Sequence, residues 1–141
     1  MIRDPFDTLI AEWNRLYSKS HTGIASEKEV HNTEKWNEYI RTQLKNWEDF
    51  YTYYIENYKR NQLYILRYEK LKEDASLEMK QVVEFLGLNF DESIEACVNN
   101  TRVQLFKRPK SKKNLKTFFS AVQKENVERI KDKVYVMLNI M

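Results

Sequence analysis

The chain has 141 residues, of which 42% are hydrophobic and 13% aromatic, and this is enough to bury the core of a single domain. Its formal net charge is only +3, from 24 basic and 21 acidic residues, which argues against a dedicated nucleic-acid-binding protein. One cysteine, Cys97, excludes an internal disulfide framework, and neither a membrane-spanning apolar run nor a signal peptide is expected in this chain.

The first predicted element is a helix from about residue 4 to residue 18. Asp4 can cap it, Pro5 suits its first position, and apolar residues at helical spacing follow. Arg3 lies just before this helix, where unpaired backbone N–H groups favour an anion. An arginine at that position predicts a phosphate-binding site.

A polar segment over residues 18–32, which contains His21 and His31, is typical of a surface loop. The longest helix is predicted next, over residues 33–58, with an apolar stripe at steps of three and four. The stripe consists of Trp36, Ile40, Leu44, Trp47, Tyr51, Tyr54, Ile55 and Tyr58, and is widened by Tyr39, Phe50 and Tyr53. Core packing is the simplest interpretation of this stripe, and an aromatic-lined ligand groove or a partner surface is the alternative.

Residues 62–67 form a short apolar run bounded by polar residues, and this pattern predicts a strand. A turn over residues 68–74 and a helix over residues 75–86 are expected to follow, with Asp74 as the helix cap. Gly87 is placed to end that helix in the left-handed conformation. The side chains expected on its buried face are Leu77, Val82, Val83, Phe85 and Leu86.

A further short helix is expected to start at Asp91, and a basic loop over residues 100–116 follows it. A last helix is predicted over residues 118–138. Its expected buried side chains are Phe119, Val122, Val127, Ile130, Val134 and Leu138.

A lone strand among helices would leave both of its edges unpaired. Its continuous apolar run suits a strand that is covered on both faces in a parallel α/β sheet, and Met1-Ile2 has the character of a second such strand. The sequence therefore predicts part of an α/β domain. In open α/β sheets ligands collect beyond the carboxyl ends of the strands, so Arg3 and Tyr68 are expected at the same edge.

Three segments resemble the sulfotransferases that use 3′-phosphoadenosine 5′-phosphosulfate (PAPS). Ile2-Arg3-Asp4-Pro5-Phe6-Asp7 is similar to the Arg-Asn/Asp-Pro-x-Asp element of that family. The block from Leu66 to Asp74, with Glu84-Phe85-Leu86-Gly87, looks like the family's stretch "YEDLKED…EFLG". Phe106-Lys107-Arg108 resembles the family's basic loop, and residues 5–15 look most like the WSC-domain-associated members.

The resemblance implies an α/β fold: the mostly helical C-terminal part of a P-loop-like parallel-sheet domain, over residues 1–141, with the N-terminal sheet and phosphosulfate loop missing. It implies PAPS as co-substrate, with Arg3 on the 3′-phosphate, Tyr68 near the adenine, and a basic loop of Phe106, Lys107 and Arg108 over the 3′-phosphate. No metal site is expected. The WSC-domain-associated members are Golgi membrane proteins that act on glycan acceptors, so a Golgi location and a glycan or other hydroxyl acceptor are implied. The chain by itself is expected to be inactive.

Two departures from the family pattern weaken the expected phosphate contacts. Ala11 stands where many members have a serine that binds the 3′-phosphate, and Pro109 stands where many have glycine. Two other functions remain open, a helical interaction module that uses residues 33–58 and, less favoured by the net charge, nucleic-acid binding through residues 108–116. A glycosylation sequon begins at Asn99.

Overall fold

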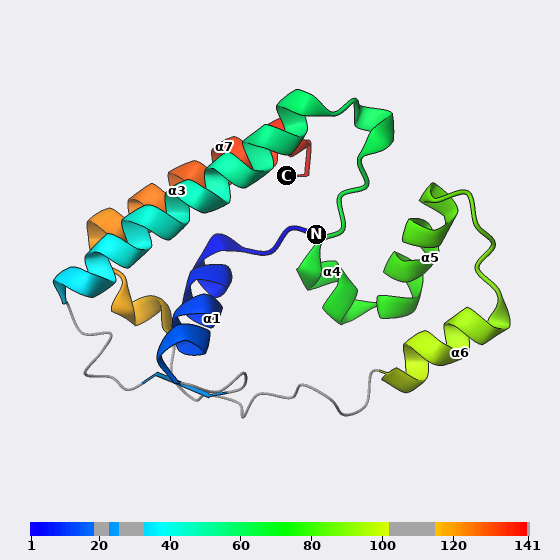
Figure 1. The fold of residues 1–141 in the computed structure, drawn as a ribbon, viewed down its shortest axis with the longest axis horizontal. Helices are drawn as coiled ribbons and strands as arrows, with labels where there is room; N and C mark the ends of the chain where they lie inside the picture. Colours follow the sequence, from blue (N-terminus) through cyan, green and yellow to red (C-terminus); the bar gives the residue numbers. More distant parts are fainter. Residues whose placement is uncertain (19–22, 26–32, 102–114, 141) are drawn as a thin grey trace. The chain divides into compact units, whose positions relative to one another are not determined.

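The computed structural model describes residues 1–18, 23–25, 33–101 and 115–140 (Figure 1). The chain divides into two compact units: Met1–Asp4 with Arg60–Lys107, and Pro5–Lys59 with Arg108–Met141. His21, His31 and the predicted phosphate-loop residues Phe106, Lys107 and Arg108 lie outside the described residues. No helix in the described ranges is long and apolar enough to cross a bilayer.

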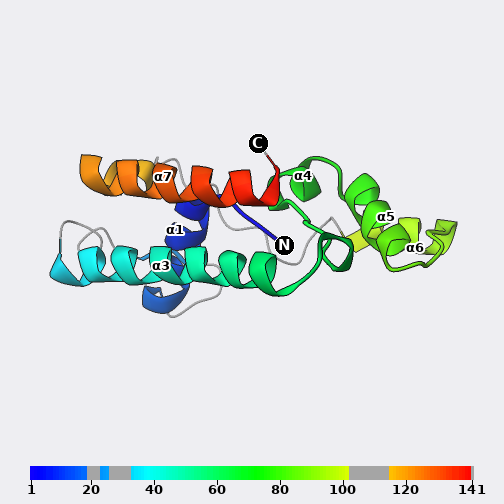
Figure 2. The ribbon, with the colours of Figure 1, turned by 90° about the horizontal axis from the view of Figure 1, so that it is seen from above.

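The second unit is built around α1 (Pro5–Tyr17), α3 (Glu34–Asn57) and α7 (Ala121–Leu138), with a 3₁₀ turn at Leu115–Phe118. Helices α3 and α7 lie side by side and run in the same direction, and α1 packs against both of them (Figures 1 and 2). The predicted helices over residues 4–18, 33–58 and 118–138 are therefore confirmed to within a few residues. Thr33 caps α3 by accepting from the Trp36 N–H at 3.1 Å.

An aromatic cluster forms the core of this unit. The ring of Trp13 lies 4.9 Å from that of Trp36 and 4.8 Å from that of Tyr39, measured between centroids. Phe119 contacts the rings of both Phe6 and Trp36 at 5.0 and 5.4 Å. These edge-to-face pairs add to the free energy of burying such large side chains. Core packing is thus the correct interpretation for the first half of the α3 stripe.

Much of the second half of that stripe is exposed, although Tyr51 and Ile55 are half-buried. The exposed side chains are Phe50, Tyr53, Tyr54 and Tyr58. Val122, at the start of α7, is also exposed, contrary to the prediction that it lies in the core. A helical period places a residue on a face of its helix, but burial also needs a neighbouring element, and near these positions the described part of the unit leaves the face uncovered.

The first unit contains a 3₁₀ turn at Arg60–Gln62, followed by α4 (Tyr68–Glu73), α5 (Ala75–Phe85) and α6 (Glu92–Thr101). The predicted cap of α5 is confirmed, because the Asp74 side chain accepts from the Leu77 N–H at 3.0 Å. Asp91 accepts from the N–H groups of Ser93 and Ile94, so the predicted start of α6 is confirmed as well. Gly87 has a φ of 73°, the left-handed conformation that its sequence position predicts.

Three predictions for this unit are wrong. Residues 62–67 do not form a strand: among the described residues their only bridge is the parallel one between Arg67 and Ile2, because no further extended segment pairs with them. Residues 68–73, predicted as a turn, form α4, since Glu, Lys and Leu are good helix formers. Three side chains predicted to be buried on the 75–86 helix are exposed: Leu77, Phe85 and Leu86. The fold is mostly helical, as expected, and the parallel pairing of Ile2 is the part of the predicted sheet that is present.

Candidate functional site

The candidate site lies in the first unit, where the beginning of the chain pairs with the segment before α4. The Ile2 N–H donates to the Leu66 carbonyl and the Tyr68 N–H donates to the Ile2 carbonyl, both at 2.8 Å. This is the alternating pattern of a parallel bridge, and Ile2 itself is buried. Arg3 and Tyr68 are thus the first residues beyond two paired, parallel segments, at the same edge, as predicted.

The pairing brings two of the five predicted site residues together. The guanidinium carbon of Arg3 lies 4.6 Å from the centroid of the Tyr68 ring, within the range of a cation–π contact. The Lys72 ammonium, one helical turn along α4, lies 5.8 Å from the same centroid. Arg3 and Tyr68 are both half-buried, so each keeps part of its side chain accessible.

Glu69 is the third polar group at this place. Its Oε1 accepts a hydrogen bond from the backbone N–H of Asp4 at 2.9 Å. Its other oxygen, Oε2, is buried without a hydrogen-bond partner in the described part of the chain. Leaving a buried polar atom unsatisfied costs about 1–3 kcal/mol. The hydrogen bond to the Asp4 N–H is therefore the one interaction in the described residues that offsets the cost of burying this carboxylate.

This arrangement has the chemistry of a site for an anion attached to a flat ring. Arginine presents a planar fork that matches phosphate oxygens bidentately, and Lys72 adds a second positive charge nearby. The face of Tyr68 offers a surface for stacking or edge contact with an aromatic ligand. In the described ranges no group of three or more His, Cys, Asp or Glu side chains is arranged to hold a metal ion.

Sequence reasoning missed Lys72 and Glu69. Both became visible only with α4, because a helix places Lys72 four residues beyond Tyr68 on the same face, whereas the predicted turn gave no such relation. The Glu69 contact joins residues 65 positions apart, and no local pattern signals it.

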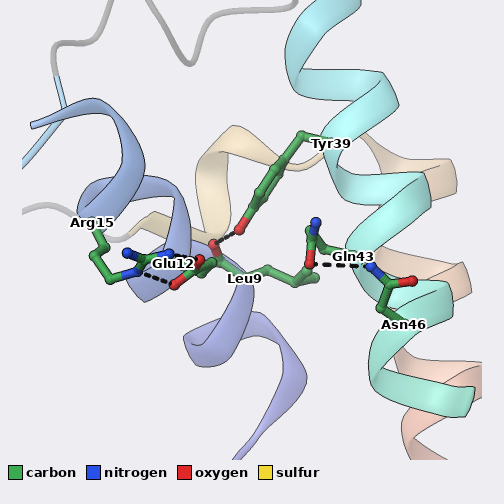
Figure 3. A network of polar contacts seen from close by, with 6 residues as sticks. All are labelled: Leu9, Glu12, Arg15, Tyr39, Gln43 and Asn46. Atoms are coloured by element: carbon green, nitrogen blue, oxygen red, sulfur yellow. Dashed lines mark hydrogen bonds and ion pairs between the residues drawn. The ribbon is translucent and has the colours of Figure 1, made fainter. Parts of the chain in front are cut away.

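A hollow lies within the other unit, between α1 and α3, and Figure 3 shows the polar contacts made by some of the residues beside it. It has a volume of about 220 Å³, and its lining residues are Thr8, Leu9, Glu12, Tyr39, Gln43, Asn46, Trp47, Phe50 and Tyr51. The Tyr39 hydroxyl donates to the Leu9 carbonyl at 2.8 Å, and burial raises the pKa of Tyr39 well above its usual range. The hydrogen bond from Arg15 lowers the pKa of Glu12, whose two oxygens are both taken by that guanidinium. The polar groups of Tyr39 and Glu12 are thus already hydrogen-bonded to other groups of the protein. We therefore interpret this hollow as a feature of helix packing, and the place around Arg3 and Tyr68 is the better candidate site.

The model of the sulfotransferase domain family matches residues 1–136. The chain belongs to the sulfotransferase family. A WSCD family member of Drosophila pseudoobscura pseudoobscura is 28% identical over 98% of the chain, and one of Drosophila melanogaster is 27% identical over 78%. Cytosolic sulfotransferase 14 of Arabidopsis thaliana is 34% identical over 67% of the chain.

The chain spans 43%, 35% and 28% of the lengths of these three relatives, in the same order. No solved structure matches it. The resemblance that the sequence motifs predicted is thus confirmed at the level of the family, and its Arg3 and Tyr68 motifs both fall within the matched range.

Proposed function

We propose that this chain forms the 3′-phosphate and adenine side of a PAPS site in a sulfotransferase. The observation that carries the proposal is the Arg3 guanidinium over the Tyr68 ring, at the edge where two parallel segments end. Arg3 would hold the 3′-phosphate and Tyr68 would contact the adenine, while Phe106, Lys107 and Arg108 would fold over the phosphate from a segment outside the described residues. The donor set fits, because an arginine fork suits phosphate and an aromatic face suits a purine.

The finer features of the family belong to the same proposal. When bound, PAPS supplies a sulfuryl group for transfer to a hydroxyl, and a glycan is the acceptor class that the WSCD resemblance favours. A Golgi location and a P-loop-like parallel sheet in the complete domain follow from the same likeness. The isolated chain is proposed to bind nucleotide without transferring the sulfuryl group, because its candidate residues serve the nucleotide end of the site.

Calorimetric titration of the 141-residue chain with adenosine 3′,5′-bisphosphate tests this proposal. Arg3→Ala is expected to weaken binding by about 10- to 100-fold, since a charge-assisted hydrogen bond contributes about 1.5–3 kcal/mol. Arg3→Lys keeps the positive charge but loses the planar guanidinium fork, so its affinity for the bisphosphate should lie between those of wild type and Arg3→Ala. Arg129→Ala is the control, because Arg129 lies in α7 of the other unit and donates to Asn126.

A second ligand separates the 3′-phosphate from the rest of the nucleotide. Adenosine 5′-monophosphate should bind more weakly than the bisphosphate, with an affinity that Arg3→Ala leaves unchanged. The proposal is wrong if the folded wild-type chain binds no bisphosphate, or if Arg3→Ala, shown by circular dichroism to be folded, binds it as tightly as wild type.

The exposed end of α3 favours a second candidate function, a helical interaction module. Phe50 and Tyr53 are 53% and 55% exposed, and the ring of Tyr54 contacts those of Phe50, Tyr53 and Tyr58 at 4.9, 5.6 and 5.5 Å. Such a module should remain a folded monomer or dimer in sedimentation experiments on the isolated chain. Aggregation of that chain at micromolar concentration would contradict this candidate.

A further inference from the structure

Arg3 is held between two fixed neighbours in the backbone. On one side, Ile2 makes two hydrogen bonds of 2.8 Å to the backbone of Leu66 and Tyr68. On the other side, the Asp4 N–H donates to the Glu69 carboxylate at 2.9 Å. The backbone of residues 2–4 is thus tied to residues 66–69 at both ends, with Arg3 in the middle.

Of these ties, only the one at Asp4 depends on a side chain. Any residue except proline can make the backbone bonds of Ile2, but the Asp4 bond needs an acceptor that reaches back from the first turn of α4. A carboxylate is a strong acceptor for a backbone N–H, about twice as strong as a neutral one. Without it, the backbone at Asp4 would lose the hydrogen bond that ties it to α4, beside the residue whose side chain carries the guanidinium.

A negative charge is otherwise unfavourable at this position. Glu69 follows Tyr68 directly, and in an anion site its charge repels the ligand and offsets the attraction of Arg3 and Lys72. Glu69 Oε2 has no hydrogen-bond partner in the described residues, so the one bond that the carboxylate makes there is to Asp4. A residue that opposes the ligand by charge can assist it only through geometry.

We infer that Glu69 is a positioning residue: by holding the backbone of Asp4, its carboxylate sets the Arg3 guanidinium over the Tyr68 ring, ready for the 3′-phosphate. This inference rests on the proposed function of Arg3. An arginine that is already oriented loses less conformational freedom when it binds, and a displacement of about 1 Å would separate its fork from the phosphate oxygens.

Charge and position predict opposite results for two substitutions. Glu69→Ala removes both the charge and the acceptor, whereas Glu69→Gln removes the charge and keeps an acceptor oxygen. If only charge matters, both variants bind adenosine 3′,5′-bisphosphate more tightly than wild type. If Glu69 positions Arg3, Glu69→Ala binds about tenfold more weakly and Glu69→Gln stays within about twofold of wild type.

The matched control is Glu73→Ala, which removes a negative charge from an exposed position of the same short helix. It should leave binding unchanged or tighten it slightly. Hydrogen exchange at the Asp4 amide gives a readout without ligand: exchange should be about tenfold faster in Glu69→Ala than in wild type, and near wild type in Glu69→Gln. Circular dichroism confirms that each variant is folded.

The outcomes separate the two proposals. If wild type binds no bisphosphate, the proposed function fails and this inference fails with it. If binding depends on Arg3 but folded Glu69→Ala binds as tightly as wild type or more tightly, the site stands and the positioning role is wrong. Unchanged exchange at the Asp4 amide in Glu69→Ala also overturns the inference, because the bond would then not hold the backbone.

Discussion

Tyr39 links the aromatic core of the second unit to the backbone of α1, and Tyr39→Phe removes that link alone. The phenyl ring would keep its edge contact with Trp13, whose ring centroid lies 4.8 Å away. What disappears is the 2.8 Å hydrogen bond from the buried hydroxyl to the Leu9 carbonyl (Figure 3). Because Leu9 lies within α1, the helix offers its carbonyl a second donor, and the oxygen is not orphaned.

The expected loss in the free energy of unfolding is therefore about 1 kcal/mol, the usual net value of one neutral hydrogen bond. For a chain of this length the midpoint of thermal unfolding should fall by about 3–5 °C. Urea denaturation monitored by tryptophan fluorescence measures the difference directly. Tyr53→Phe is the control, because Tyr53 is 55% exposed and its substitution should change stability by less than about 0.5 kcal/mol.

The pH dependence gives a second test of the same interaction. Burial raises the pKa of Tyr39 in the folded chain, whereas in the unfolded chain a tyrosine ionises near pH 10. The contribution of Tyr39 is thus complete below about pH 10 and decreases as the pH rises further, because only the unfolded chain ionises there. At pH 11 the ionisation of Tyr39 in the unfolded chain lowers the free energy of unfolding of wild type by about 1.4 kcal/mol. Tyr39→Phe has no ionisable group at this position and is not affected in this way.

The disadvantage of Tyr39→Phe seen at pH 8 should accordingly disappear by pH 11 and turn into a small advantage of about 0.4 kcal/mol, because the ionisation penalty in wild type exceeds the value of the hydrogen bond. Burial also raises the pKa of Tyr64, but that tyrosine is present in both proteins and cancels in the comparison. Equal stability of the two proteins at pH 8, or a constant difference between them from pH 8 to pH 11, would refute the reasoning.

Two further predictions concern helix ends. Gly87→Ala should destabilise the chain by about 1–2 kcal/mol, because φ is 73° and the space around Gly87 is open, so backbone strain is the whole cost. Gly87→Asn should lose less stability, since asparagine tolerates the left-handed conformation better than alanine. If thermal melts show that Gly87→Ala is as stable as wild type, the turn rearranges freely and this reasoning is wrong. Ser120→Ala should lower the free energy of unfolding by about 1 kcal/mol, because Ser120 and Gln123 cap α7 through reciprocal hydrogen bonds of 3.2 and 2.9 Å. Ser120→Asp keeps a capping oxygen and should retain most of the stability. If Ser120→Asp loses as much stability as Ser120→Ala, the capping role is wrong.

The helices were largely predictable because their signals are local. Pro5 at the start of α1, Asp74 before α5 and Gly87 after it each act within a few residues of their own position. The helix α4 was missed because six residues give too short a pattern for periodicity to detect. The exposed aromatic end of α3 was not separable from its buried beginning, since both halves have the same spacing.

The candidate site was predictable in part. The motifs around Arg3 and Tyr68 pointed to the same end of a nucleotide, and the expected common edge is present in the parallel bridge of Ile2 with Arg67. The roles of these residues in binding stay predictions until a nucleotide is titrated. The basic loop with Lys107 lies outside the described residues and stays a prediction as well.

The sequence by itself determined the family, the helix ends and the identity of two residues, Arg3 and Tyr68, at one edge of the paired segments. It could do so because motifs and helix caps depend on residues that are close together in the sequence. Only the tertiary structure decided that the Arg3 guanidinium lies 4.6 Å from the Tyr68 ring and that Glu69 holds the backbone beside it. The physical reason is the separation along the chain. A hydrogen bond between residues 65 positions apart forms only after folding has paired their segments, and no local spacing encodes its partner.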